Sequence, residues 1–326
     1  MNATRLAAYV DQRGPADTIR VGPLPVPDLG PDDVLVAVTA ASVNPVDTYV
    51  RSGRYDTPIP IPFIIGRDLV GTVAEIGSAV RDFAVGDPVW ANSLGHAGRQ
   101  GAATDLAVVA RERLYRLPDG VDPELAVAVA HPAVTAYLGW FRRAGIRPGW
   151  TVFVGGGAGN VGIAAIQLAT RAGVRVIASA RDSHFNRCLA AGADAVVDYR
   201  APDLADRIAA TAPNGVDVYW DTSGTNDTDV AAAVLRPGGR MLVTAARTPV
   251  TVTLAPLYTN DVTIDGFVIS RASAADLAAA AGLINSMLAA GELSTRITDR
   301  LPLTRAAEAH RRIESGEVDG RLLLTM

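Results

Sequence analysis

The sequence has 326 residues, which is enough for two domains that each bury a core of their own. Hydrophobic residues make up 49% of it, as in a globular protein, yet no apolar run reaches the roughly 20 residues that span a bilayer. The formal net charge of −4, without any run of Lys or Arg, argues against a nucleic-acid partner. The N-terminal segment lacks the apolar core of a secretory signal, so we expect a cytoplasmic protein with no membrane partner.

Cysteine and histidine are scarce. Cys188 is the single cysteine, so an intrachain disulfide is impossible, and we expect its thiol to be buried as a small hydrophobe. The four histidines show no ligand spacing with Cys188, so we expect no metal site. His131 is expected to pack or to cap a helix, and His96 stays open as a substrate contact.

Short strands separated by turns are expected in the first 124 residues. The run from Val34 to Ala41 is strongly apolar, and Pro58 to Pro62 alternates isoleucine with proline, which forbids helix. Turn signals about every ten residues suggest a compact, barrel-like β domain. The other expected strands are Leu6–Val10, Val70–Ile76 and Pro88–Ala91.

The pattern becomes helical after Asp122, which can cap a helix, with Pro123 in the first turn. We expect helix from Leu125 to Ala130 and again from Ala133 to Ala144, ending at Gly145.

From Thr151 onward, strand-like apolar runs alternate with helical segments. This alternation predicts a parallel, doubly wound sheet. Its strands are expected at Thr151–Val154, Val174–Ala178, Ala195–Asp198, Val216–Asp221, Gly239–Val243 and Val262–Val268.

The last part of the chain is expected to return to the β domain, because a doubly wound sheet of six strands is complete before it. Its elements are expected at Ala274–Ala290 (helix), Ile297–Leu301 (strand), Leu303–Ser315 (helix) and Arg321–Leu324 (strand). The expected domains are residues 1–124 and 269–326 for the β-rich domain and 125–268 for the domain with the parallel sheet.

A glycine-rich turn joins the first strand of the parallel sheet to a helix. Gly157, Gly159 and Gly162 have the G-x-G-x-x-G spacing of dinucleotide-binding folds, between a buried strand and the helical segment Val161–Ala169. The first glycine permits the turn, the second lets backbone approach the pyrophosphate, and the third lets the helix pack closely. The helix N-terminus offers N–H groups to the phosphates. The alternative is a glycine-rich surface turn.

The residues after the second strand of this sheet indicate which dinucleotide binds. An NAD site usually carries Asp or Glu there, whereas a carboxylate would repel the 2′-phosphate of NADP. After Ala178 come Ser179 and Arg181, which can donate hydrogen bonds to phosphate, and no acid precedes Asp182. We therefore expect NADPH. Arg181 capping an exposed turn is the alternative, and Asp182 would oppose the assignment if the strand ended later.

The segment from Val43 to Tyr55 (VNPVDTYVRSGRY) is the most specific of a set of motifs. The others are Gly66–Val73, Gly86–Val89, Pro132–Tyr137, the glycine-rich turn, Asp221–Gly224 and Pro237–Arg240. In the same order along nearly the whole chain, they resemble the zeta-crystallin/quinone oxidoreductases, zinc-free members of the medium-chain dehydrogenase/reductase superfamily. Asn160 and Gly155 depart from many relatives, and Asn92–Gly101 is not typical of the family.

The resemblance implies a Rossmann-type domain and a β-rich, GroES-like domain shaped as a partly open barrel, with the active site in the cleft between them. It implies zinc-independent, NADPH-dependent reduction of quinones by hydride or electron transfer from the nicotinamide. An NADPH-dependent enone or alkenal reductase is the alternative within the enzymes, and an NADPH-binding module with little turnover is the alternative outside them. Homodimers or homotetramers are implied, often joined through a sheet edge such as Thr263–Ile269.

Carried over by position, the resemblance gives Tyr55, Asn44 and Tyr49 as candidate catalytic residues. Tyr55 is expected to donate a hydrogen bond to a substrate oxygen, with the other two shaping the pocket. The alternatives are core aromatics with satisfied hydroxyls and, for Asn44, a turn residue. The candidate cofactor-binding residues are Thr135, Gly157, Ala158, Gly159, Asn160, Val161, Gly162, Ser179, Arg181, Ser223, Gly224, Phe267, Val268, Ile269, Gly320 and Arg321.

Overall fold

The computed structural model describes residues 4–246 and 248–326, and these form two compact units. The first unit contains residues 4–131 and 272–326, and the second contains residues 132–271. We expected domain boundaries after residues 124 and 268. The divisions between the two units lie after residues 131 and 271, and the first of them falls within helix α2 (Pro123–Tyr137).

The first unit is built on a mixed, largely antiparallel sheet. Its strand order is β15-β16-β3-β5-β6-β8, and β7 also pairs with β3. The strands are β3 (Asp33–Val43), β5 (Asp68–Ile76), β6 (Pro88–Ala91), β7 (Leu106–Ala110), β8 (Leu114–Arg116), β15 (Ile297–Pro302) and β16 (Arg321–Thr325). A small sheet of β1 (Thr4–Val10), β2 (Arg20–Pro25) and β4 (Phe63–Ile64) accompanies it. The C-terminal strand β16 pairs antiparallel with β3, so the end of the chain completes this sheet.

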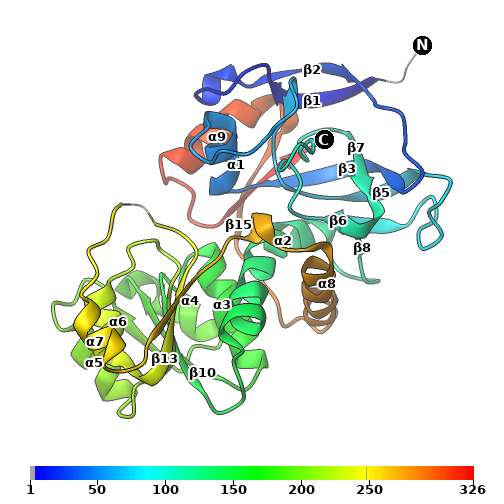
Figure 1. Cartoon of the computed structure of the whole chain (residues 1–326). Helices are drawn as coiled ribbons and strands as arrows, with labels where there is room; N and C mark the ends of the chain where they lie inside the picture. The colour runs from blue at the N-terminus through cyan, green and yellow to red at the C-terminus, as the bar shows by residue number, and fades with distance from the viewer. Residues whose placement is uncertain (1–3, 247) are drawn as a thin grey trace. The chain divides into compact units, whose positions relative to one another are not determined.

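Two helices from distant parts of the sequence contact each other in the first unit. Helix α1 (Pro45–Ser52) and helix α9 (Ala306–Glu314) lie side by side (Figure 1). We had assigned no helix to the first of these segments. Its local signals are Pro45 in the first turn and Gly53 in the left-handed conformation that ends it.

Helix α8 (Ala274–Ala289) is attached to the first unit by the side chain of Asn285. The indole nitrogen of Trp90 donates to Asn285 Oδ1 at 2.9 Å, and Asn285 Nδ2 donates to the carbonyl of Arg116 at 2.9 Å. These two bonds link the helix to β6 and β8.

Helix α2 corrects one expectation. We expected a break at His131–Pro132, but the helix is continuous, and a π-helical segment (Leu138–Ala144) carries it to Gly145. The residues from Ala126 to Ala130 are all at most 2% exposed, so burial of its apolar surface stabilises the helix through the proline.

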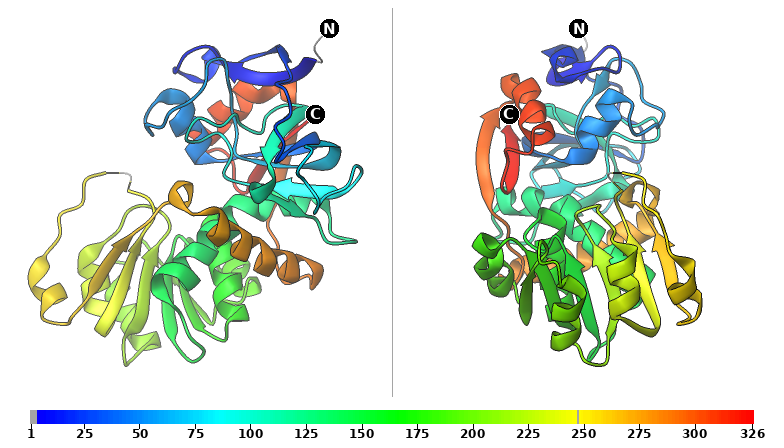
Figure 2. Two further views of the ribbon diagram at one scale, coloured as in Figure 1. Left: turned by 45° about the vertical axis from the view of Figure 1, so that its right-hand side comes forward. Right: turned by 90° about the vertical axis from the view of Figure 1, so that its left-hand side faces the viewer.

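The second unit is a six-stranded parallel sheet with the order β11-β10-β9-β12-β13-β14, which is the Rossmann order, and Figure 2 shows helices against it on both sides. The strands are β9 (Thr151–Gly155), β10 (Arg175–Ala180), β11 (Ala195–Asp198), β12 (Val216–Asp221), β13 (Leu235–Val243) and β14 (Thr263–Gly266). The helices are α3 (Asn160–Arg171), α4 (Phe185–Ala190), α5 (Leu204–Thr211), α6 (Thr228–Val234) and α7 (Leu254–Tyr258). This confirms the predicted α/β class with a parallel and a β-rich part.

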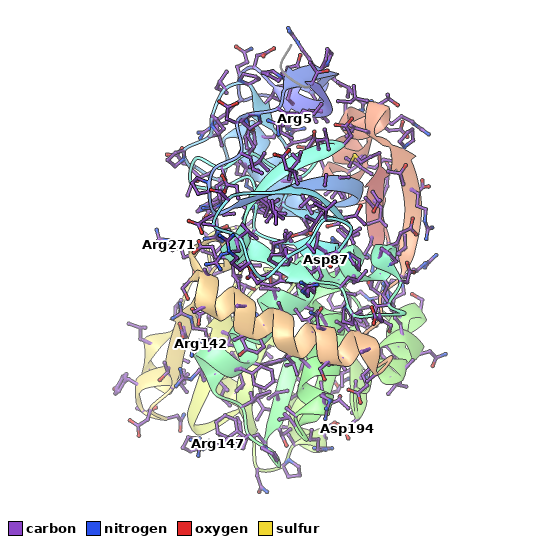
Figure 3. All side chains as sticks on the ribbon, turned by 90° about the vertical axis from the view of Figure 1, so that its right-hand side faces the viewer. Arg5, Asp87, Arg142, Arg147, Asp194 and Arg271 are labelled. Carbon is purple, nitrogen blue, oxygen red and sulfur yellow. The ribbon has the colours of Figure 1, made fainter. Side chains whose placement is uncertain are left out.

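Buried apolar residues occupy the middle of the parallel sheet, where Phe153 of β9 stacks on Tyr219 of β12 at 4.8 Å between ring centroids. Charged side chains such as Arg147 and Asp194 lie on the outside (Figure 3). No helix within residues 4–246 and 248–326 has the length and hydropathy needed to cross a membrane.

Candidate functional site

The glycine-rich turn lies between the end of β9 and the start of α3, at the point where the strand order reverses. The N–H of Gly157 donates to the carbonyl of Ser179 at 2.8 Å, which ties the turn to β10. Gly159 is the N-cap of α3 and has an extended backbone, with φ −72° and ψ 167°. The first helical turn therefore starts directly after Gly159, and the N–H groups of such a turn are the ones that can bind an anion.

The three glycines of the turn are needed for different physical reasons. A Cβ on Gly157 would lie 2.8 Å from the Cβ of Ala178, and one on Gly162 would lie 2.4 Å from the carbonyl oxygen of Gly156. A Cβ on Gly159 would meet only that same oxygen, at 3.2 Å. Packing thus requires the first and third glycines, whereas a Cβ on the second would meet one backbone oxygen that would have to move by a few tenths of an ångström.

The loop after β12 lies against this turn. The hydroxyl of Thr222 donates to the carbonyl of Gly155 at 2.8 Å, and the carboxylate of Asp221 accepts the N–H of Ser223 at 2.8 Å. Gly224 has a φ of +83°, which favours glycine. The loop that carries the candidate residues Ser223 and Gly224 therefore lies beside the glycine turn, and their contact with a cofactor stays a prediction.

The end of β10 differs from our expectation. The strand continues to Ala180, so Ser179 lies within it and is only 2% exposed. Arg181 is the first residue after the strand, and its Nε donates to the hydroxyl of Tyr199 at 3.4 Å. Tyr199 follows β11, the neighbouring parallel strand, whose Asp198 lies opposite Ala180. Arg181 and Tyr199 thus meet at the carboxyl ends of two adjacent strands.

Both carboxylates near this corner are paired with Arg200. Its guanidinium donates to Asp198 at 2.9 and 3.1 Å and lies 3.7 Å from Asp182. The hydrogen bonds from Arg200 lower the pKa of Asp198 to about 2. Asp182, which would have opposed an NADP assignment, lies within ion-pair distance of the same guanidinium, although both of the hydrogen bonds go to Asp198. The sequence analysis missed Tyr199 and Arg200, although their position directly after the third predicted strand was a usable signal.

Further candidate residues of the second unit lie after β14 and on α2. The N–H of Phe267 donates to the carbonyl of Val243 at 3.0 Å, so the chain stays beside β13 past the end of β14. The Phe267 ring lies 5.7 Å from that of Trp220, Val268 is half-buried, and Ile269 is buried. Thr135 is buried on α2. The approach of these residues to a nicotinamide stays a prediction.

A buried polar network occupies the first unit around Asn44. The Asn44 side chain donates through Nδ2 to Asp68 at 2.8 Å and accepts through Oδ1 from Arg321 at 2.9 Å. The hydroxyl of Ser42 also donates to Asp68, at 2.8 Å. The Asn44 N–H donates to Asp47, at 2.8 Å, at the start of α1. Two candidates that we had given separate roles, Asn44 and Arg321, are thus direct partners.

This arrangement bears on what both candidates can do. Asn44 and Arg321 are at most 2% exposed, and the two ends of the Asn44 amide are bonded to buried charged groups. Asn44 can therefore hold the network in place but has little to offer a substrate. Gly320, the preceding candidate, is also buried, and its φ of +143° suits the close approach of Thr298.

The network contains two carboxylates and two guanidiniums, all buried. Arg67 Nε lies 3.8 Å from an Asp47 oxygen. Burial raises the pKa of Asp47 to about 7 against the opposing effect of Arg67, and burial likewise raises the pKa of Asp68. Burial, together with Arg67 and Arg321, lowers the pKa of His131, so this histidine is neutral at pH 7.

The two candidate tyrosines lie in the same unit with different surroundings. The Tyr55 hydroxyl lies 3.5 Å from Nε2 of His96, and the two rings stack at 5.8 Å between centroids. The Arg67 guanidinium lies 6.0 Å from the centre of the Tyr55 ring. Tyr49 is more exposed, and the guanidinium of Arg54 covers its ring at 4.5 Å. The structure thus joins Tyr55 to His96, which we had treated separately.

Two protein families match the chain. The family described as an alcohol dehydrogenase GroES-like domain matches residues 30–119, and that described as a zinc-binding dehydrogenase matches residues 160–286. Among curated proteins, the quinone oxidoreductase of Mus musculus is 29% identical over 93% of this chain and 91% of its own length. The NADPH-dependent alkenal/one oxidoreductase of Arabidopsis thaliana is 29% identical over 92% of this chain and 73% of its own.

Two solved structures resemble this chain over nearly its whole length. An NAD-dependent alcohol dehydrogenase has a TM-score of 0.90 at 30% identity, covering 98% of this chain and 99% of its own. A mycobacterial protein in complex with NADPH has a TM-score of 0.85 at 28% identity, covering 99% of this chain and 100% of its own. The chain belongs to the quinone oxidoreductase family of the medium-chain dehydrogenase/reductase superfamily. It is an oxidoreductase of the quinone-reductase type that uses a nicotinamide cofactor and a small-molecule substrate.

In this quinone oxidoreductase relative, the residues that the structure describes contain no group of three or more His, Cys, Asp or Glu side chains able to hold a metal ion. Cys188 is buried below the glycine turn, where its Sγ would lie 3.3 Å from a Cβ on Gly157. Burial raises the pKa of this thiol to about 11, so it remains a thiol at neutral pH.

Proposed function

We propose that this oxidoreductase prefers NADPH and reduces quinones without zinc. The observation that carries the cofactor preference is the corner formed by Arg181 and Tyr199, where both neighbouring carboxylates are paired with Arg200. A guanidinium and a hydroxyl there can donate to the 2′-phosphate of NADP. The Arg181 guanidinium is hydrogen-bonded to the neutral hydroxyl of Tyr199, which supports the proposal that its charge is available for the phosphate.

The glycine turn would hold the pyrophosphate at the N-terminus of α3. The nicotinamide, when bound, supplies a hydride. The chain itself must therefore bind and orient the cofactor and the substrate and polarise the substrate. Tyr55 is our candidate for donating a hydrogen bond to the substrate oxygen, with Tyr49 beside it. The buried network of Asn44, Asp68 and Arg321 would fix the start of α1, which carries Tyr49, and so position this side of the site.

An enone or alkenal reductase is the second candidate within the enzymes. The name of the Arabidopsis relative favours it, and so does a tyrosine hydroxyl that could protonate carbon or oxygen. Reduction of a quinone needs a proton only at oxygen, which the Tyr55 hydroxyl can supply, whereas an enone or alkenal also needs a proton at carbon. We therefore rank the quinone first.

One experiment distinguishes these functions. Chelator-treated protein is mixed with NADPH and, in parallel, with an ortho-quinone and a straight-chain 2-enal. Turnover with the quinone alone supports the proposal and shows that metal is dispensable. Preferential turnover of the enal would replace it with the alkene-reductase function, and tight NADPH binding without either turnover would favour a binding module.

We also propose a homodimer or homotetramer joined through β14, in the cytoplasm. This strand is at the end of the sheet order, so one of its edges has no partner strand in the described chain. Ile264 on it is 45% exposed, and Leu254 and Tyr258 on the nearby α7 are 67% and 72% exposed. Apolar exposure at an open sheet edge supports association there.

A further inference from the structure

The loop of residues 92–101 is the part of the first unit least typical of the family, and its backbone is unusual. Ser93 and Ala97 have φ values of 59° and 52°, a conformation that residues with a Cβ rarely adopt. Gly95 and Gly98 share it, with φ values of 60° and 82°. His96 thus lies among left-handed residues. Such strain persists only where the surroundings hold the chain, and it is concentrated at functional sites.

Hydrogen bonds hold this loop against the segment that follows Tyr55. The N–H of Ala97 donates to the hydroxyl of Thr57 at 3.0 Å, and the N–H of Gly98 donates to the carbonyl of Pro58 at 2.8 Å. On the other side, the N–H of Leu94 donates to the carbonyl of Arg67 at 3.0 Å. These bonds fix His96 from both directions, next to the tyrosine.

The fixed histidine faces the hydroxyl of Tyr55. Its Nε2 lies 3.5 Å from that oxygen, and the planes of the two rings differ by only 14°. A separation at the limit of a hydrogen bond is common in an enzyme without substrate, because catalytic hydrogen bonds tighten when the complex forms. Both side chains are half-buried, so water can reach the pair.

The charged groups around the pair are mainly positive. Arg67 lies 6.0 Å from the Tyr55 ring centre, and Arg99, of the same loop as His96, interacts electrostatically with Arg67. The carboxylate of Asp56, next to Tyr55, is paired with Arg13 at 2.8 Å. Asp47 is directed to Arg67 at 3.8 Å. This surrounding charge favours a negative oxygen on the substrate or on Tyr55.

We infer that His96 is the proton source for Tyr55, forming a two-residue relay that protonates the substrate oxygen. This inference rests on the proposed function. When the substrate gains a hydride, it is reduced by two electrons as the nicotinamide is oxidised, and its oxygen becomes an anion. The O–H bond of Tyr55 then breaks and its proton forms the O–H bond of the product. The Nε2–H bond of protonated His96 breaks in turn, its proton restores the Tyr55 hydroxyl, and His96 regains a proton from water.

The relay makes the rate depend on the protonated form of His96, which therefore acts through Tyr55 as a positioning and proton-supplying residue. Quinone turnover should therefore fall as rising pH removes the proton from His96. Loss of the histidine should remove this dependence and lower kcat about ten-fold or more, which is less than the roughly 10²–10⁴-fold of direct general acid catalysis because His96 acts through Tyr55. KM for NADPH should change little.

The test compares His96→Gln, His96→Ala and Tyr55→Phe with the wild-type enzyme. We expect His96→Gln to flatten the pH profile of kcat, and added imidazole to restore activity to His96→Ala but not to Tyr55→Phe. In the cofactor-free protein, Tyr55→Phe should shift the ¹⁵N signal of His96 Nε2 and leave that of His310 in place. The NMR measurement needs no turnover, and the imidazole rescue excludes a merely structural effect of the substitution.

The outcomes separate this inference from the proposed function. If the wild type reduces quinone and His96→Gln has the same rate and pH profile, the relay is wrong and the proposed function stands. An unchanged His96 signal in Tyr55→Phe would also overturn the relay. If the wild type does not oxidise NADPH with quinone, the proposed function fails and the relay fails with it.

Discussion

Nδ2 of Asn44 lies 2.8 Å from a carboxylate oxygen of Asp68, and the two residues are 1% and 0% exposed. Asn44 also accepts a hydrogen bond from Arg321, at 2.9 Å, so one neutral amide stands between a buried anion and a buried cation. The three residues come from the start of α1, the start of β5 and the start of β16. The amide thus connects three distant segments of the chain at one point.

Asn44→Ala should destabilise the protein, because it leaves a buried carboxylate and a buried guanidinium each without a hydrogen bond that they make in the wild type. The expected loss is on the order of 2–4 kcal/mol, which lowers the melting temperature by several degrees. Asn186→Ala is the control, since Asn186 is a residue of α4 outside this network. Equal melting temperatures for the two variants, measured by calorimetry, would show that the Asn44 amide does not stabilise the folded protein.

Asp47 should make the stability depend on pH. Its pKa of about 7 in the folded protein lies above the ordinary value of 3.8, so the folded state binds the extra proton between these values. Stability from this group is fully present below about pH 4 and is lost as pH rises through 7. Between pH 5.5 and pH 8, the free energy of unfolding should therefore fall by about 1–2 kcal/mol more in the wild type than in Asp47→Asn.

Urea unfolding of both proteins at several pH values measures this difference. The amide that Asp47→Asn introduces would keep an oxygen for the N–H of Asn44, so the helix start is preserved. If the free energies of unfolding of the two proteins change by the same amount across the pH range, Asp47 does not carry the extra proton.

Gly159 and Gly162 should respond differently to alanine. Gly159→Ala requires only a shift of a few tenths of an ångström at the Gly156 oxygen, so it should lower stability less than Gly162→Ala, while its methyl group should weaken NADPH binding about ten-fold or more. Gly162→Ala places a Cβ at 2.4 Å from the Gly156 oxygen and should lower stability as well. Calorimetry and a fluorescence titration check both. Normal NADPH affinity in Gly159→Ala would show that the pyrophosphate does not bind at this turn.

Arg181→Ala should weaken NADPH far more than NADH. The guanidinium would bind only the 2′-phosphate, which NADH lacks, and one charge-assisted hydrogen bond contributes about 1.5–3 kcal/mol. Arg175→Ala is the matched control, because Arg175 is an exposed arginine at the opposite end of the same strand. Binding titrations of both variants with both cofactors give the comparison. Equal losses of NADPH and NADH affinity in Arg181→Ala would refute the assignment.

Periodicity and glycine spacing were enough to predict the parallel sheet, because most of its strands contain a short apolar run and are followed by a helix. They did not predict α1, whose surface is mostly polar and whose start depends on Asn44 and Asp47. Nor could they show that β10 extends to Ala180, because alanine and serine carry no strong strand signal. The network of Asn44, Asp68 and Arg321 depends on strand pairing between β3, β5 and β16, which no local pattern encodes.

The most direct test is a comparison of kcat/KM for NADPH and for NADH, with an ortho-quinone as the acceptor and chelator present. We predict quinone-dependent oxidation with a preference for NADPH of about ten-fold or more, because the corner of Arg181 and Tyr199 offers donors to the 2′-phosphate, while the nearby carboxylates are paired with Arg200. Equal values, or a preference for NADH, would contradict the role assigned to that corner. No quinone-dependent oxidation of either cofactor would contradict the proposed function itself.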